Sequence, residues 1–372
     1  MAPPGEARLR MEIPRRPNIR RARLWRRHPE REGWVICDLC YRRCPIAPGK
    51  YGACGVRKNI GGELYTMVYG LLSSMALDPI EKKPLLHFNP GSTVLSISTV
   101  GCNFFCQFCQ NWVISQSRLE KGLMGVQETP EGVVEKALYY GAHGITYTYN
   151  EPTIFIEFLE DTAREAKKHG LFNTMVTNGY ATPEAIDELG SAIDAATVDF
   201  KGGGNRDFYR KVMRVPDPEP IYESLLAMKD KGWFIEVTNL VVPKIGDKPE
   251  DVRSMARWIV ENLGPETPFH LLRFHPDYKL RDLPHTPVET LEKLAGIAKE
   301  EGLEYVYIGN VWGHPLESTY CPRCGYKVIE RIGFTIVRHD LTEDNRCPRC
   351  GYKINIKGRI HAGGRGYPIS VI

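Results

Sequence analysis

The chain has 372 residues, of which 42% are hydrophobic and 25% charged, a composition typical of a globular protein with a sizeable core. No apolar run is long enough to span a bilayer, and no apolar segment follows the basic N-terminus as in a secretory signal, so we expect a cytoplasmic protein without membrane contact. The net charge of +4 is uneven: residues 1–31 hold ten Arg and three Glu, so the remainder is acidic and nucleic-acid binding by the body of the protein is disfavoured.

Taken in chain order, the sequence divides into four regions. Residues 1–33 form a basic N-terminal arm, either an RNA- or partner-binding segment or a loose or docked extension, and residues 34–90 form a module with four cysteines. Residues 91–316 are expected to form an α/β barrel. Residues 317–372 hold a second four-cysteine module and a Gly-rich C-terminal tail.

The long middle region alternates strand-like and helix-like segments. Strands are predicted at 94–100, 144–149, 172–177, 195–200, 234–242, 267–274 and 304–310. Amphipathic helices are predicted near 130–140, 153–169, 182–191, 218–231, 250–263 and 287–301. Repeated strand–helix units predict a parallel sheet with right-handed crossovers, so the fold class is α/β. Six or seven units suit a partial (β/α)6-type or full TIM-like barrel, with a doubly wound open sheet as the alternative.

The cysteines are the most informative residues of the chain. All eleven fall into three tight groups, which is unlike a secreted disulfide framework and typical of metal ligation in a reducing compartment. The groups are Cys37, Cys40, Cys44 and Cys54; Cys102, Cys106 and Cys109; and Cys321, Cys324, Cys347 and Cys350.

The central group follows the first predicted barrel strand with C-x3-C-x2-C spacing. Cys102, Cys106 and Cys109 can ligate three irons of a [4Fe–4S] cluster and leave the fourth iron open. S-adenosylmethionine (SAM) can chelate that iron through its amino and carboxylate groups. An electron passed into the sulfonium would then release a 5′-deoxyadenosyl radical that abstracts hydrogen from a substrate. A zinc site with a fourth ligand elsewhere is the alternative interpretation.

Several motifs together resemble a known family. The segments 78–92 (DPIEKKPLLHFNPGS), 101–112 (GCNFFCQFCQNW), 147–153 (YTYNEPT) and 176–180 (VTNGY) are similar to those of AmmeMemoRadiSam-system radical SAM enzymes, which themselves resemble pyruvate formate-lyase activating enzyme. The resemblance implies a radical SAM barrel and a reductant such as ferredoxin or flavodoxin. It also implies Memo-like and AMMECR-type proteins as partners, and leaves the substrate open as a small molecule or a protein.

The resemblance also implies individual roles around SAM. Glu151 would bind the SAM amino group, Asn178 would line the SAM pocket, Asp199 and Lys201 would lie beside the SAM carboxylate, and His275 would lie near the adenosyl group.

One feature departs from the family. The fifth strand carries no Arg and reads Glu-Val-Thr-Asn over 236–239, so either the contacts differ or Arg273 substitutes. Asn239 at that strand's end joins the candidate SAM residues. Because parallel barrels build their sites at the carboxyl ends of the strands, these side chains are expected to converge there.

The two flanking cysteine sets are expected to hold further metals. Cys321, Cys324, Cys347 and Cys350 form two C-x2-C pairs within repeated Cys-Pro-Arg-Cys-Gly-Tyr segments, which predicts a zinc ribbon, with rubredoxin-like iron as the rival. Cys37, Cys40, Cys44 and Cys54 suit either zinc or a second [4Fe–4S] cluster, and their spacing does not decide between the two.

Two other function classes compete with a radical enzyme acting on an unidentified substrate. One is an activating enzyme that installs a glycyl radical on a partner protein, against which the missing fifth-strand Arg and the extra cysteine modules weigh. The other is a non-enzymatic zinc protein that binds nucleic acid through its arm, which leaves the central cysteine triplet unexplained.

Overall fold

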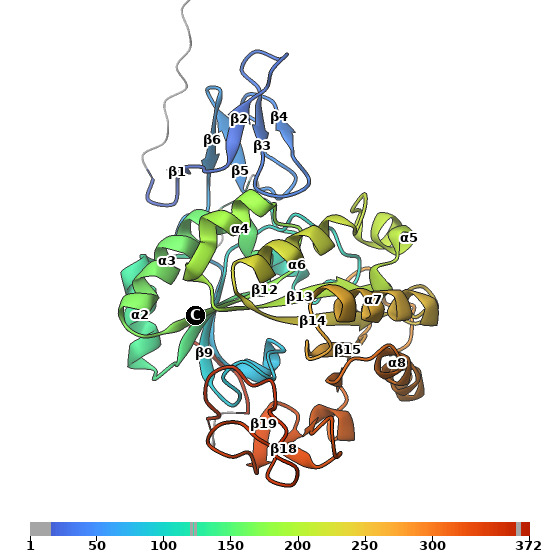
Figure 1. The fold of residues 1–372 in the computed structure, drawn as a ribbon. Helices are drawn as coiled ribbons and strands as arrows, with labels where there is room; N and C mark the ends of the chain where they lie inside the picture. Colours follow the sequence, from blue (N-terminus) through green and yellow to red (C-terminus); the bar gives the residue numbers. More distant parts are fainter. Residues whose placement is uncertain (1–15, 120–121, 123–124, 362–365) are drawn as a thin grey trace, which may run out of the picture.

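A computed structural model describes residues 16–119, 122, 125–361 and 366–372, so the first fifteen residues of the basic arm lie outside the described part. At its centre is a nine-stranded sheet with the order β16-β15-β14-β13-β12-β11-β9-β8-β20 (Figure 1). The seven strands from β9 to β16 in this sheet run parallel. They are β9 (Thr93–Ser98), β11 (Gly144–Tyr147), β12 (Phe172–Thr177), β13 (Ala195–Lys201), β14 (Phe234–Val241), β15 (Phe269–Arg273) and β16 (Val306–Gly309). The seven predicted strands and their parallel arrangement are therefore confirmed.

Helices connect these strands and cover the outer face of the sheet (Figure 1). They are α2 (Pro130–Tyr139), α3 (Ile156–Lys168), α4 (Pro183–Leu189), α6 (Pro220–Asp230), α7 (Pro249–Asn262) and α8 (Val288–Glu300), as predicted. Threonine hydroxyls begin two of them: Thr129 accepts from the Gly132 amide and Thr182 from the Ala185 amide. Shorter helices are α1 (Trp112–Ser115) and α5 (Arg206–Phe208). None of the helices in the described ranges is long and apolar enough to cross a lipid bilayer.

The sheet does not close into a full barrel. Strands β8 (Ser74–Pro79) and β20 (Ile369–Ser370) extend it beyond β9 in antiparallel orientation, so its edges are β20 and β16. Both added strands come from outside the predicted barrel region. Strand β8 buries most of its side chains against β9, which is the physical reason it joins the central sheet.

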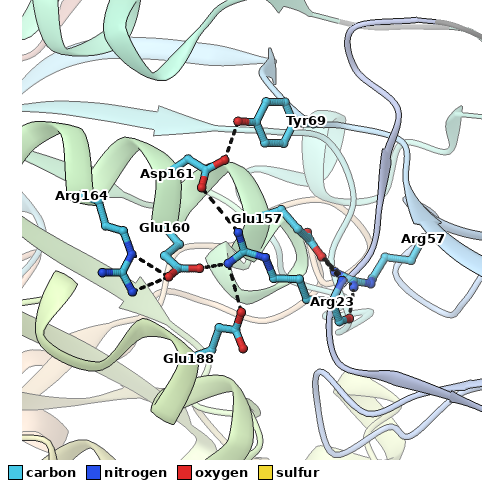
Figure 2. A network of polar contacts seen from close by, with 8 residues as sticks. All are labelled: Arg23, Arg57, Tyr69, Glu157, Glu160, Asp161, Arg164 and Glu188. Atoms are coloured by element: carbon cyan, nitrogen blue, oxygen red, sulfur yellow. Dashed lines mark hydrogen bonds and ion pairs between the residues drawn. The ribbon is translucent and has the colours of Figure 1, made fainter.

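The N-terminal segment forms two small sheets at one end of the molecule (Figure 1). They contain β1 (Arg20–Arg21), β2 (Trp25–Arg27), β3 (Val35–Cys37), β4 (Pro45–Ile46), β5 (Arg57–Ile60) and β6 (Glu63–Thr66). Figure 2 shows how polar contacts attach this segment to two helices: Arg57 pairs with Glu157 and Arg23 with Glu160 on α3, and Arg23 also pairs with Glu188 on α4. From residue 16 onward the arm is therefore docked on the body of the protein.

The C-terminal segment lies at the opposite end of the molecule (Figure 1). It is a three-stranded antiparallel sheet of β17 (Thr319–Tyr320), β18 (Lys327–Ile332) and β19 (Thr335–His339). It has its own small core, which includes Cys321, Cys347 and Val328 and packs on Tyr305 and Tyr307 of the barrel. The remaining strands, β7 (Leu71–Leu72) and β10 (Val126–Gln127), pair with each other.

Candidate functional site

The central cysteine loop begins at a glycine that no other residue could replace without strain. Gly101, directly after β9, has φ +90°, and a Cβ added there would lie 2.5 Å from the Cys54 carbonyl oxygen. The loop that follows turns the side chains of Cys102, Cys106 and Cys109 into one cavity of about 560 Å³ at the carboxyl ends of the parallel strands. The three cysteines that the sequence groups as potential iron ligands therefore lie at the end of the barrel where active sites form.

In this loop Cys106 is buried and Cys102 and Cys109 are half-buried, which disfavours the charged form of their thiols. Burial raises the pKa of all three, and raises that of Cys106 to about 12 although Lys201 opposes the effect. A bound cation removes this barrier, because a coordinated thiol is deprotonated outright. Phe104 and Phe108, both buried, line the same cavity and limit the access of water to it.

Glu151 lies beside this loop, and its carboxylate is already engaged. Oε1 accepts from the Thr153 amide (3.0 Å), the Thr153 hydroxyl (2.6 Å) and the Thr177 hydroxyl (2.8 Å), while Oε2 accepts only from the Asn178 amide (2.8 Å). Burial raises the pKa of Glu151, and these hydrogen bonds oppose the increase. Since Oε2 can accept a second hydrogen bond, one position remains for a donor in the cavity.

The structure also brings Asn178, Asp199 and Lys201 to the cavity wall. The Asn178 side-chain amide donates to Asn103 Oδ1 at 2.7 Å, which ties the end of β12 to the cysteine loop. Lys201 Nζ lies 3.0 Å from Asp199 Oδ2, and the Thr238 hydroxyl donates to the other Asp199 oxygen. Burial opposes the charge on Lys201, but Asp199 and then Cys106 outweigh it and raise its pKa, so the lysine is a fixed cation beside the thiols.

His275 and Arg273 line the cavity further along β15 and its loop, and Asn239 does not line it. His275 is exposed and its ring lies 4.8 Å from that of His285. Asn239 is buried with Oδ1 accepting from the Gly203 amide at 2.9 Å. Leu240, the next residue of β14, does line the cavity, so the alternation of side chains along a strand turns Asn239 to the other face.

The far wall of the cavity holds a charged cluster to which sequence reasoning assigned no role. Lys83 Nζ lies 2.5 Å from Asp78 Oδ2, and Lys82 Nζ lies 2.8 Å from Asp78 Oδ1. The Tyr149 hydroxyl donates to the same Asp78 carboxylate. Lys83 is buried, and burial lowers its pKa to about 8 although Asp78 opposes the decrease. In the sequence, the Asp-Pro-Ile-Glu-Lys-Lys motif at 78–83 marks this cluster, but its neighbours along the chain do not indicate that it faces the cysteines.

A second buried group completes that wall. His270 Nε2 lies 2.7 Å from Glu236 Oε2, and both side chains are buried on neighbouring strands. His270 and Tyr307 both line the cavity with their rings stacked at 5.1 Å. Burial would raise the pKa of Glu236, but His270 and then His87 outweigh it and lower the pKa, so the carboxylate is ionised. The cavity therefore combines a thiol-lined end with a polar wall of fixed charges.

The four C-terminal cysteines form a compact set. The Sγ atoms of Cys321 and Cys350 lie 3.5 Å apart and those of Cys324 and Cys347 3.7 Å apart, with all four within 4.8 Å of one another. Each half makes the same turn, in which the amide after the second cysteine, that of Gly325 or Gly351, donates to the carbonyl of the first. The set can hold one metal ion.

The four N-terminal cysteines are brought together between the strands of the small sheets. Cys37, Cys40 and Cys54 are buried and Cys44 is half-buried. Burial raises the pKa of each thiol, and neighbouring thiols of the set raise it further. Arg57 lies behind them: burial opposes its charge, but Glu157, Cys37 and Cys54 outweigh this and raise its pKa.

Comparison with known proteins identifies the family to which the central part of the chain is similar. Residues 96–259 match the model of the Radical SAM superfamily. The chain is 49% identical over 300 residues to the uncharacterized protein MJ0808 of Methanocaldococcus jannaschii, covering 81% of this chain and 88% of that one. It is 24% identical over 220 residues to the pyruvate formate-lyase-activating enzyme of Clostridium pasteurianum, covering 54% of this chain and 87% of that one. The chain also matches a solved domain of a pyruvate-formate lyase-activating enzyme from Bacteroides vulgatus, over 45% of this chain and all of that one, at 19% identity and a TM-score of 0.40.

The chain belongs to the radical SAM superfamily. The family implies a [4Fe–4S] cluster and SAM, and the residues of this structure fit both. The three thiols share one cavity, and Glu151 Oε2 keeps a free acceptor position beside them. The general radical SAM reaction and the homology to pyruvate formate-lyase activating enzymes that the sequence predicted are thereby confirmed at the level of the superfamily.

Proposed function

We propose that the protein is a radical SAM enzyme of the AmmeMemoRadiSam type that generates a 5′-deoxyadenosyl radical and uses it to abstract hydrogen from a substrate held in the same cavity. One observation carries the proposal: Cys102, Cys106 and Cys109 line a cavity whose remaining walls are formed by residues from the carboxyl ends of the strands and by buried charges. Catalytic constellations on parallel barrels are built in this way.

Cys102, Cys106 and Cys109 would hold three irons of the cluster and leave the fourth for SAM. When bound and reduced, the cluster supplies the electron that splits SAM into methionine and the radical. Glu151 Oε2 has a free acceptor position for the SAM ammonium, and Lys201, fixed by Asp199, offers a cation for the SAM carboxylate. Asn178, which ties β12 to the cysteine loop, would set the width of this part of the cavity.

The distal wall would bind the substrate. Lys82 and Lys83 share one carboxylate, Asp78, so the group carries an excess positive charge that suits an anionic substrate group. His270 and Tyr307 line the same space and can form hydrogen bonds. His275, at the exposed part of the cavity, would contact the adenosyl end of SAM. A cavity of about 560 Å³ that must also hold SAM favours a small substrate.

Activation of a partner protein by a glycyl radical is the second candidate, because relatives of the chain are named pyruvate formate-lyase-activating enzymes. An electron donor such as ferredoxin or flavodoxin is proposed for either function. Memo-like and AMMECR-type proteins are proposed as partners, and a cytoplasmic location is proposed with them.

For the C-terminal cysteines we propose zinc, since a Zn–S bond of about 2.3 Å gives a sulfur–sulfur edge of about 3.8 Å in a tetrahedron.

The proposal is tested with anaerobically reconstituted protein, SAM and dithionite. The wild type should release 5′-deoxyadenosine, and the variant with Cys102, Cys106 and Cys109 all changed to Ala should release none. A matched control, Cys324→Ala, removes a cysteine of the C-terminal set, none of whose four thiols lines the cavity, and should keep SAM cleavage. Undiminished SAM cleavage by the triple variant would refute the assignment. Adding a protein-free metabolite extract should then increase the rate of 5′-deoxyadenosine release. An increase only with candidate partner proteins would favour the second candidate, activation of a partner protein.

A further inference from the structure

The N-terminal and C-terminal cysteine sets differ in how far apart their sulfurs lie. All four sulfurs of the C-terminal set, which includes Cys321 and Cys347, lie within 4.8 Å of one another. Across the part of the chain that the structure describes, no other three Cys, His, Asp or Glu ligand atoms meet that limit. No three sulfurs of Cys37, Cys40, Cys44 and Cys54 therefore lie as close together as those of the C-terminal set, and the same holds for the three sulfurs of the central cluster loop.

This spacing distinguishes two kinds of metal site. One zinc ion holds four sulfurs about 3.8 Å apart, because each Zn–S bond is about 2.3 Å long. A cubane cluster binds each thiolate to a different iron, so its cysteine sulfurs lie roughly 6 Å apart. The N-terminal thiols are nevertheless neighbours, since Cys40 lies within electrostatic reach of Cys37, Cys44 and Cys54. An open set of this kind suits a cubane cluster better than a single ion.

The surroundings of the N-terminal set also suit an iron–sulfur cluster. Val35, Leu39, Ile46 and Val56 are buried together with Cys37 and Cys54 in the main core, and Cys44 packs against it. Backbone groups of the same loops lie near the sulfurs and favour their thiolate forms: Leu39, Arg42, Ala53 and Val56 oppose the rise in the pKa of Cys37, Cys40, Cys44 and Cys54 respectively. Burial and N–H···S hydrogen bonds are the features by which proteins set the potential of such clusters.

The N-terminal set is also packed directly against the central cysteine loop. The Cys54 carbonyl faces Gly101, the residue before Cys102, so closely that no Cβ would fit between them. Arg42 donates to the Asn103 carbonyl on the other side of Cys102, and Arg118 Nη1 donates to the Ala53 carbonyl at 2.6 Å. A group held by the N-terminal thiols would thus be separated from the central site by little more than contacting backbone.

We propose that Cys37, Cys40, Cys44 and Cys54 hold a second [4Fe–4S] cluster that exchanges single electrons with the central one. An external one-electron donor, reduced flavodoxin or dithionite, would reduce the second cluster by one electron. The second cluster would return to its oxidised state by passing that electron to the central site, where SAM consumes it. The electron transfer rests on the proposed function of the central site, but the presence of iron at the N-terminal cysteines does not.

The test uses the full-length chain with Cys102, Cys106 and Cys109 all changed to Ala, reconstituted with iron and sulfide without oxygen. Iron, acid-labile sulfide and zinc are measured per chain, together with the EPR spectrum of the reduced protein with and without SAM. We expect one cluster's worth of iron and sulfide and a reduced-cluster signal that SAM does not change. In the matched variant with Cys40 and Cys44 changed to Ala, the remaining signal should respond to SAM.

A triple variant that contains zinc but no iron, or no metal at the N-terminal cysteines, would overturn the proposal. If that variant does not fold by circular dichroism, the Mössbauer spectrum of the wild type decides. Two clusters' worth of [4Fe–4S] iron then supports the proposal and one cluster's worth overturns it. Failure of the wild type to cleave SAM would instead refute the proposed function. The iron counts would still decide whether the N-terminal cysteines hold a cluster.

Discussion

The buried ion pair between Arg57 and Glu157 should be one of the most costly contacts to break in this protein. Arg57 lies behind the N-terminal cysteines and Glu157 on α3, and their side chains are 1% and 5% exposed (Figure 2). Two hydrogen bonds join them, at 2.9 and 3.2 Å, and Glu157 Oε1 also accepts from the Arg23 amide at 2.8 Å. The pair therefore attaches the N-terminal segment to the barrel.

Glu157→Gln leaves the shape of the site almost unchanged but leaves the Arg57 guanidinium buried without the carboxylate that pairs with it. Removing one partner of a buried pair costs about 3–5 kcal/mol, a shift of roughly a hundredfold or more in the unfolding equilibrium. Replacing both partners by apolar groups, as in Arg57→Met with Glu157→Leu, should recover much of the loss because no orphaned charge remains. An exposed pair on the surface, Asp207 with Lys211, offers a matched control.

The measurement is urea unfolding of the reconstituted protein followed by circular dichroism without oxygen. The midpoint should fall strongly for Glu157→Gln, partly recover in the double variant, and stay at the wild-type value for Asp207→Asn, whose pair is solvated. A Glu157→Gln midpoint equal to that of the wild type would refute the argument, since it would mean that the buried arginine does not depend on the Glu157 carboxylate.

Three further outcomes are expected. Glu151→Ala should weaken SAM binding by about 1–3 kcal/mol, the usual effect of a lost charge-assisted hydrogen bond, while iron content stays at the wild-type value; SAM titration of the reduced-cluster EPR signal measures it, and loss of iron with normal SAM binding would contradict the placement. Cys347→Ser should remove the zinc from the C-terminal set and leave SAM cleavage intact, as judged by metal analysis beside a 5′-deoxyadenosine assay; a variant that keeps its full zinc content would contradict the ligand assignment. Burial opposes ionisation of Asp78, but Lys83 and Lys82 outweigh it and lower its pKa from 3.8 to about 2. The ionised carboxylate therefore contributes about 2 kcal/mol to the free energy of unfolding above pH 3.8, and this contribution is lost as the pH falls toward 2. Acid unfolding of Asp78→Asn should lack that step, and an unchanged acid transition would exclude this role for the carboxylate.

Much of the architecture could be predicted because its signals are local. Alternating strand and helix patterns depend on which faces of a segment are apolar, so β9 to β16 and their helices were found from the sequence. The C-x3-C-x2-C spacing fixes three ligands within one loop, so the predicted triplet of Cys102, Cys106 and Cys109 needed no long-range information to be recognised.

Other features depend on contacts between distant segments, and only the tertiary structure decided them. Lys83 and His270 are 187 positions apart in the numbering, yet they line one cavity with Cys102, because β8 and β15 belong to the same curved sheet. Asn239 is at the expected strand end, but the alternation of side chains turns it away from the cavity. All four C-terminal sulfurs lie within 4.8 Å of one another, whereas no three of the N-terminal sulfurs do, although both sets contain four cysteines at short spacings. Spacing along the chain fixes which ligands are available, whereas packing of the surrounding backbone fixes how far apart their sulfurs lie.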